Sequence, residues 1–165
     1  MMICLRGIIT FYSAIPTETA RSSMRTLIAY YSRTGTTRIV AEQLARIMAA
    51  DIEEVIDTKG RRGIFGFLMS GYQAMTEKAA VIKPPQKDPS QYDLVVIATP
   101  IWAGKMSCAA LAYLRAMPPS GKAPGAVAFV ATSGGDDDAA KAFAQMGAAC
   151  GRTPVATARY IERYV

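Results

Sequence analysis

Hydroxyl groups and one glycine cluster in a short segment that could bind an anion. Its residues are Ser32, Arg33, Thr34, Gly35, Thr36 and Thr37. The segment lies between an apolar run and a helical pattern, so its backbone N–H groups would face outward at a helix start, where the helix dipole favours negative charge. It matches neither a Walker A loop nor a G-x-G-x-x-G fingerprint, and its hydroxyl donors suit a terminal monophosphate. An ordinary helix cap by Thr36 or Thr37 is the alternative.

A second segment carries the only tryptophan of the chain. Its residues are Thr99, Pro100, Ile101, Trp102, Ala103 and Gly104, and they follow another apolar run. At the tip of a loop, the indole of Trp102 could lie against a flat apolar ligand. Packing in the core or at its rim is the alternative, because tryptophan is usually largely buried.

A third segment contains two adjacent glycines, which would let the backbone approach a flat ligand closely. Its residues are Thr132, Ser133, Gly134 and Gly135. The three aspartates that follow, Asp136–Asp138, look like a metal cluster. Because acidic residues in a first helical turn offset the helix dipole, we interpret them as capping residues and predict no metal site.

The composition excludes several kinds of chemistry. The chain has 165 residues, no histidine and three cysteines that form no C-x-x-C pair, so histidine triads, zinc ribbons and iron–sulfur clusters are not expected. Free thiols point to a reducing compartment such as the cytoplasm. No stretch of about 18 apolar residues predicts a membrane span. The net charge of +6 is scattered, without the interleaved aromatic residues of single-strand binders, so nucleic acid is not an expected partner.

Strand and helix patterns alternate from Met24 onward. Apolar runs predict strands, and helical spacing of apolar residues predicts a helix over Thr37–Ala50. Further helices are expected within the crossover 57–90, from Ser107 to the proline pair at 118–119, and from the aspartates to about Cys150. The predicted strands are Thr26–Tyr31, Asp51–Ile56, Leu94–Ala98, Ala126–Ala131 and Pro154–Ile161.

Strands joined by helical crossovers indicate an α/β domain with a parallel sheet covered on both faces. Such sheets bind ligands at the carboxyl ends of their strands, near the point where the strand order reverses. The three segments follow the first, third and fourth predicted strands. We therefore expect them to meet at one edge of the sheet and to form one site.

The run Tyr30–Thr37 resembles the phosphate loop of the flavodoxin family, usually written [ST]-x-T-G-x-T. The resemblance extends from Arg25 to about Tyr160. It implies a flavodoxin-like three-layer sandwich with a five-stranded parallel sheet of order 2-1-3-4-5, and FMN as the cofactor. It also implies that the second segment holds the isoalloxazine ring and that the third touches its pyrimidine end. The cofactor supplies the redox chemistry, so no catalytic side chain is expected.

Three functions are compatible with these residues. The first is an FMN-bound protein that carries electrons to and from a redox partner protein. The second is an NAD(P)H-dependent oxidoreductase that reduces a quinone or another small acceptor, since the string from Ala98 to Ser107 is also similar to the T-P-x-x-x-G-N-M loop of FMN-dependent quinone reductases. The third is a domain of this fold that has lost flavin and serves as an interaction module.

Two features depart from the family. Flavodoxins continue into a fifth helix after the fifth strand, whereas this sequence ends at Val165. We expect the bare sheet face to be covered by residues 1–23, an N-terminal extension or mis-assigned start before the domain 24–165, or by a second copy in a homodimer. The domain is also basic: Arg6, Arg21 and Glu18 contribute +1, which leaves +5 for residues 24–165. Electron-carrier flavodoxins are acidic, so a basic domain favours acidic partners or small substrates.

Overall fold

A computed structural model of the chain describes residues 24–58, 80–118, 124–135 and 139–161. The predicted N-terminal extension 1–23, the helix expected around residues 65–75 and the three aspartates at 136–138 lie outside the described residues. Within those residues no helix is both long and apolar enough to cross a membrane.

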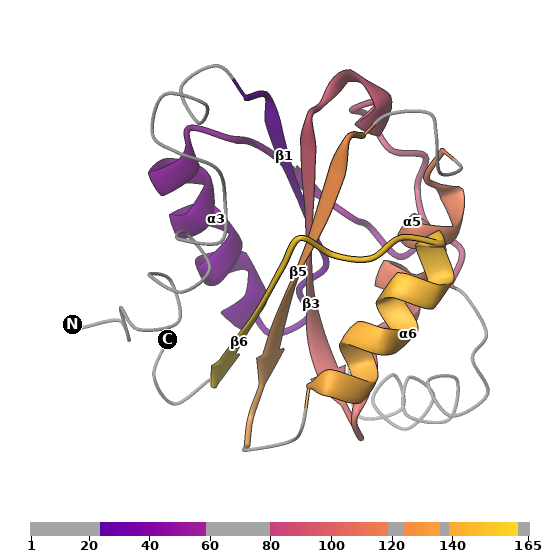
Figure 1. Cartoon of the computed structure of the whole chain (residues 1–165). Helices are drawn as coiled ribbons and strands as arrows, with labels where there is room; N and C mark the ends of the chain where they lie inside the picture. Colours follow the sequence, from indigo (N-terminus) through magenta and orange to yellow (C-terminus); the bar gives the residue numbers. More distant parts are fainter. Residues whose placement is uncertain (1–23, 59–79, 119–123, 136–138, 162–165) are drawn as a thin grey trace.

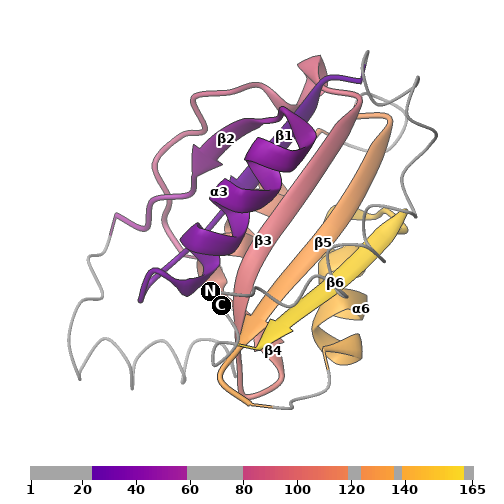
Figure 2. The same ribbon diagram turned by 90° about the vertical axis from the view of Figure 1, so that its left-hand side faces the viewer.

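The centre of the molecule is a twisted sheet of five parallel strands (Figures 1 and 2). The strand order β2-β1-β3-β5-β6 corresponds to the predicted order 2-1-3-4-5, because the short strand β4 pairs only with the end of β3 and is antiparallel to it. The strands are β1 (Thr26–Tyr30), β2 (Asp51–Glu54), β3 (Leu94–Trp102), β4 (Lys105–Met106), β5 (Ala126–Ser133) and β6 (Ala156–Ile161).

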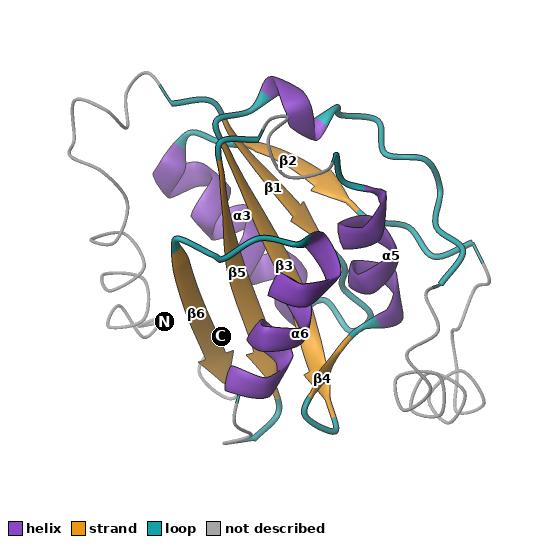
Figure 3. Cartoon of the chain, turned by 45° about the vertical axis from the view of Figure 1, so that its right-hand side comes forward, coloured by secondary structure: helices purple, strands orange, loops and turns teal. Residues whose placement is uncertain are grey.

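Helices cover both faces of this sheet, which explains why the central strands are apolar throughout. Helix α3 (Thr36–Met48) packs on one face, and helices α5 (Cys108–Ala116) and α6 (Ala140–Cys150) pack on the other (Figures 1 and 3). Every residue of β1 is buried. Leu27 and Ala29 belong to the core on the α5 side, and Ile28 and Tyr30 to the core on the α3 side.

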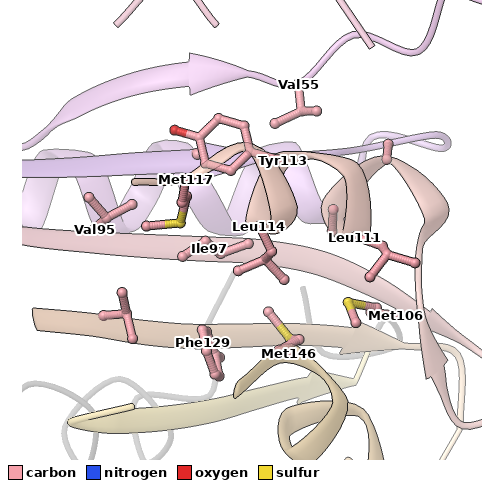
Figure 4. Packing of buried hydrophobic residues seen from close by; sticks show 14 of the residues in the cluster. Val55, Val95, Ile97, Met106, Leu111, Tyr113, Leu114, Met117, Phe129 and Met146 are labelled. Atoms are coloured by element: carbon pink, nitrogen blue, oxygen red, sulfur yellow. The ribbon is translucent and has the colours of Figure 1, made fainter. Parts of the chain in front are cut away.

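The core on the α5 side is built from large side chains (Figure 4). Phe129 of β5 and Ile97 of β3 pack beneath Leu114 of α5 and Met146 of α6, and all four are at most 1% exposed. This packing fixes the two helices against the middle of the sheet and so helps to hold the carboxyl ends of β3 and β5 in place.

Strand β3 is longer than predicted. The sequence predicted a strand over Leu94–Ala98 followed by a loop, but the strand continues to Trp102 and folds back through Ala103 and Gly104. Both turn residues have positive φ, 51° and 72°, as a two-residue turn of type I′ requires. The extension occurs because Ile101 pairs with Met106 and both are buried. The strand prediction was wrong there because it followed the apolar run only as far as Thr99.

The remaining boundaries agree with prediction to within two residues. Helix α3 begins at Thr36, one residue before its predicted start, and β5 runs two residues further, to Ser133. Helix α5 ends at Ala116 and Met117 is extended, because a residue that precedes proline disfavours the helical region. The crossover 57–90 contains a short 3-10 turn, Pro89–Gln91, and a bridge between Asp57 and Ile82.

The α3 side of β6 is the face that the fifth helix of flavodoxins, missing from the predicted elements, would cover. Ala156, Ala158 and Tyr160 face this side and are buried, from 5% to 8% exposed. Residues 162–165 lie outside the described part of the chain. The expected cover for this face, whether residues 1–23 or a second copy, remains a prediction.

Candidate functional site

The three segments begin side by side at one edge of the sheet. In the sheet register Tyr30 of β1 pairs with Ala98 of β3, and Ala98 pairs with Val130 of β5. All three strands are parallel, so the chain leaves each of them in the same direction. The first, second and third segments therefore lie around a common edge, as the alternation of strands and helices predicted.

The first segment opens helix α3 with a glycine. Gly35 is the residue that precedes the helix, its φ is 105°, and within the described residues no side chain caps the helix start. The Gly35 N–H donates to Ser32 Oγ at 3.1 Å, and the first helical hydrogen bond runs from the Ile39 N–H to the Gly35 carbonyl. A cap by Thr36 or Thr37, the alternative left open by the sequence, is therefore not what the structure contains.

Space is available beside this helix start. A Cβ added at Gly35 would have nothing within 4 Å among the described residues, so the glycine is needed for its positive φ and not because a neighbour crowds it. A cleft of about 330 Å³ runs along residues 31–35, Arg38 and residues 54–57. Arg38 Nη2 forms an ion pair with Glu54 Oε1 at 2.7 Å at the edge of this cleft. The carboxylate raises the pKa of the Arg38 guanidinium, mainly through the hydrogen bond.

Thr37 points away from the open side of the first segment. It is 2% exposed, and its hydroxyl lies 2.7 Å from the hydroxyl of Thr132, which is 3% exposed. This buried bond joins the start of α3 to the end of β5. Thr37 and Thr132 therefore hold the first and third segments together, and their hydroxyl groups bond to each other inside the protein.

The second segment is closed by a buried hydrogen-bond network. Thr99 donates to Ser107 Oγ at 2.9 Å and accepts from the Ser107 N–H at 3.2 Å, and both residues are fully buried. Ser107 Oγ also accepts from the Ala110 N–H, so it caps α5 as the sequence predicted. Thr99 fixes the base of the hairpin, while Ile101 packs against Ala131 and Ala142. Both side chains are buried, at most 4% exposed.

Trp102 connects the first and second segments. Its ring meets Tyr31 edge to face, with centroids 6.2 Å apart and planes at 89°. The guanidinium carbon of Arg33 lies 4.9 Å from the centroid of the same ring. Trp102 is only partly exposed: part of the indole packs against neighbours and part stays accessible, and its contact with a flat ligand stays a prediction.

The third segment presents backbone to the outside. Thr132 and Ser133 are buried, and Ser133 Oγ donates to the Gly135 carbonyl at 2.8 Å. Gly134 and Gly135 are exposed, and a Cβ added at Gly135 would have nothing within 4 Å in the described part of the chain. The serine shapes the turn, and the two glycines form its open surface.

The predicted site residues thus divide into two groups. The inner group supports the segments from inside the protein. Its members are buried: Thr37, Thr99, Ile101, Thr132 and Ser133. An outer group is at least partly exposed: Ser32, Arg33, Thr34, Gly35, Thr36, Pro100, Trp102, Ala103, Gly104, Gly134 and Gly135. All of them lie within or directly after the carboxyl ends of strands that end at the same edge, so it is burial that divides them.

Sequence reasoning missed two residues of this site, Tyr31 and Arg38. Tyr31 lies directly after β1 and contacts Trp102, and its position at the carboxyl end of a central strand was the available signal. Arg38 lines the cleft from the first turn of α3, and no sequence signal could have found it, because a surface arginine on a helix is common. Among the described residues no group of histidine, cysteine, aspartate and glutamate could hold a metal ion.

Neither a protein-family model nor a curated protein matches the sequence. Solved structures do match. A flavoprotein from Lactobacillus acidophilus NCFM in complex with FMN is 23% identical over 83% of this chain and 93% of its own, with a TM-score of 0.69. A flavodoxin, WrbA-like protein from Agrobacterium tumefaciens is 19% identical over 78% and 73%, with a TM-score of 0.51.

An NADH:FMN oxidoreductase is 18% identical over 84% of this chain and 76% of its own, with a TM-score of 0.52. The three matches span most of each chain and share the parallel α/β architecture described above. With this strand order and these helices on its two faces, the chain has the flavodoxin-like fold.

Proposed function

We propose that this chain binds FMN at the edge where its three segments meet and transfers electrons through it. The observation that carries the proposal is the start of α3. A 13-residue helix begins there at a glycine of positive φ, no described side chain caps it, and an arginine and several hydroxyl groups surround it. A helix start of this kind favours a phosphate group.

The outer residues of the site fit the remaining parts of FMN. Ser32, Thr34 and Thr36 offer hydroxyl groups beside the helix start. Trp102 offers a partly exposed indole, and the exposed Gly134 and Gly135 offer backbone without side chains. A planar aromatic ligand can therefore contact the second and third segments while its phosphate contacts the first. The structure matched at a TM-score of 0.69 contains FMN, which supports the same cofactor here.

The protein's own contribution is position and electrostatics. FMN, when bound, accepts and releases electrons at its ring. The Thr37–Thr132 bond and the Thr99–Ser107 network hold the phosphate end and the ring end of the site at a fixed separation. Arg33 and Arg38 place positive charge near the phosphate loop, and Trp102 shields one side of the site from water.

A carrier function is favoured over reduction of small substrates by NAD(P)H. The sequence feature that suggested a reductase was the string from Ala98 to Ser107, which ends in Met106 and Ser107. In the structure Met106 is buried against Ile101, and Ser107 caps α5, so local packing accounts for both. The charge of +5 on residues 24–165 suits an acidic partner or a small substrate and does not separate the two functions. For the carrier function we propose an acidic redox protein as the electron-exchange partner.

The test is a visible absorption spectrum of the purified protein before and after addition of FMN and gel filtration. We expect flavin bands that stay with the protein, and no bleaching when NADPH is added without a partner. Bleaching by NADPH would replace the carrier by a reductase. A protein that stays colourless after reconstitution would contradict FMN binding and leave the third function, an interaction module. The elution volume in the same experiment tests the proposed homodimer.

A further inference from the structure

A second cavity, of about 200 Å³, lies beside β2, the last strand at its end of the sheet. Its walls are residues 52–56, residues 83–87 and Tyr113 of α5. Pro84 and Pro85 have no N–H to donate, so this part of the crossover cannot pair with the edge of β2 as a further strand would. Among the described residues that line the cavity, none belongs to the three segments of the proposed FMN site.

Two hydrogen bonds attach the crossover to the chain of β2, one on each side of the two prolines. The Lys83 N–H donates to the Ile56 carbonyl at 2.9 Å, and the Gln86 N–H donates to Oε1 of Glu53. One carboxylate oxygen of Glu53 thus fixes the outer wall of the cavity. The other, Oε2, is buried and has no hydrogen-bond partner among the described residues.

The Tyr113 hydroxyl is a second buried polar group without a partner. Tyr113 is 2% exposed, and within the described part of the chain its Oη forms no hydrogen bond. The ring projects from α5 toward the chain that carries Val55 (Figure 4). Burial, and then the negative charge of Glu53, raise the pKa of Tyr113. The hydroxyl therefore keeps its proton and needs an acceptor, whereas Glu53 Oε2 needs a donor.

We propose that this cavity binds a small neutral molecule whose polar group satisfies both atoms, accepting from Tyr113 Oη and donating to Glu53 Oε2. A hydroxyl group and a primary carboxamide both have this chemistry. A buried donor and a buried acceptor that lack partners each cost free energy, so a ligand that supplies both partners is favoured.

The size of the cavity and its charges define the rest of the ligand. A cavity of about 150 Å³ holds one benzene molecule, so a volume of about 200 Å³ admits a single ring with its polar group. The charged side chains that line the cavity are two of each sign: Glu53, Glu54, Lys83 and Lys87. Because these charges balance, a ligand without net charge is favoured.

Water alone fills such a cavity poorly. An ordered water needs about two to four polar partners, whereas the side chains of Val55, Pro84 and Pro85 offer none. The outer wall, residues 83–86, is exposed, so a ligand enters by moving surface residues and leaves the core in place.

The test is calorimetric titration of the full-length protein with phenol and with benzamide, each of which donates and accepts. Anisole, which accepts but does not donate, is the matched control ligand. The proteins compared are the wild type, Tyr113→Phe, and Tyr92→Phe as the control variant. Tyr92 does not line the cavity, and its hydroxyl donates to Asp51 at 2.6 Å. The thermal midpoint of each protein is also measured without ligand.

We expect phenol, benzamide or both to bind the wild type and Tyr92→Phe about tenfold more tightly than anisole does, the value of one hydrogen bond. Tyr113→Phe should lose about tenfold of that affinity. Without ligand, Tyr113→Phe should have a higher midpoint than the wild type, because it removes a buried hydroxyl that has no partner. Tyr92→Phe should have a lower midpoint, because it loses the bond to Asp51.

Equal affinity for the three ligands, or no binding, would overturn the proposal. A midpoint of Tyr113→Phe below that of the wild type would also overturn it, because the hydroxyl would then already have a partner such as an ordered water. None of these readouts involves a flavin, so the result is independent of the proposed function.

Discussion

The segments after β1 and β3 both lead into helices, but they begin those helices in opposite ways. Helix α5 starts at Ser107, which is fully buried, caps the helix and is itself bound by Thr99. Helix α3 starts at Gly35, with no cap from any described side chain and with open space beside it. Both helices start at the same edge of the sheet. The start of α5 is capped by a side chain of the protein, whereas the start of α3 is open, and we propose that a ligand occupies it.

This difference separates the hydroxyl groups that stabilise the fold from those that we expect to bind a ligand. Hydroxyl groups in the second segment satisfy buried partners, so their loss should unfold the protein. Hydroxyl groups at the open side of the first segment face the cleft, so their loss should weaken ligand binding. Sequence composition does not separate the two, since each segment contains one glycine and at least one hydroxyl side chain.

The largest expected effect comes from Ser107→Ala. The substitution removes the cap of α5 and the buried hydroxyl that accepts from Thr99 Oγ1, although Thr99 keeps the N–H of residue 107 and the Pro100 carbonyl as partners. The two losses together destabilise the fold by about 2–3 kcal/mol. Urea unfolding followed by circular dichroism measures the change. An unfolding free energy within about 0.5 kcal/mol of the wild type, the range of ordinary surface substitutions, would contradict the assignment of this network to stability.

Ser32→Ala is the matched substitution in the first segment. Ser32 is partly exposed and accepts from the Gly35 N–H, so the stability cost should stay near 1 kcal/mol or below. We expect the FMN dissociation constant to rise about tenfold. If Ser32→Ala unfolds the protein as readily as Ser107→Ala, the two segments are not built differently.

The bond between Thr37 and Thr132 tests whether the first segment is also anchored from below. Thr37→Val and Thr132→Val should each destabilise by roughly 1–3 kcal/mol, because each leaves a buried hydroxyl unsatisfied. The double variant should cost clearly less than the sum, with a coupling energy of about 1 kcal/mol or more. Additive losses would mean that the 2.7 Å contact contributes no specific stabilisation.

Gly35→Ala measures how much the positive φ of residue 35 matters for stability and binding at the open start of α3. Alanine at a φ of 105° is strained by about 1–2 kcal/mol, and relief of that strain would move the loop that we propose to bind phosphate. Gly151→Ala, at the end of α6 with a φ of 64°, serves as the control. Both should lower the thermal midpoint, whereas only Gly35→Ala should weaken FMN binding.

Ala103→Gly should have the smallest effect, in the stabilising direction. Ala103 adopts a φ of 51° in the hairpin turn, a conformation that glycine adopts without strain. The gain is offset in part by the greater freedom of glycine in the unfolded chain, so we expect about 0.5–1 kcal/mol. A lower unfolding midpoint would show that the hairpin depends on the alanine side chain.

Much of the fold could be predicted because its signals are local. Apolar runs such as those of β1 and β3 indicated buried parallel strands, and Ser107 and Pro118 marked the two ends of a helix. The hairpin at Ala103 and Gly104 was missed because its pairing joins Ile101 to Met106. The turn pair Ala103-Gly104 lacks the Asn-Gly or Asp-Gly sequence that typically indicates such a hairpin.

The sequence by itself determined the order of strands and helices, the three segments at the ends of β1, β3 and β5, and the glycine and hydroxyl content of each. Local backbone preferences and burial patterns are enough for that. Only the tertiary structure decided which hydroxyl groups form buried hydrogen bonds, as those of Thr37, Thr99 and Thr132 do. It also decided that the Arg33 guanidinium lies over the Trp102 ring. The contacts of Thr37 with Thr132 and of Arg33 with Trp102 join segments more than 60 residues apart, and such distances are set by how the helices pack on the sheet. Thr99 meets Ser107 across the hairpin, whose pairing is also a tertiary outcome.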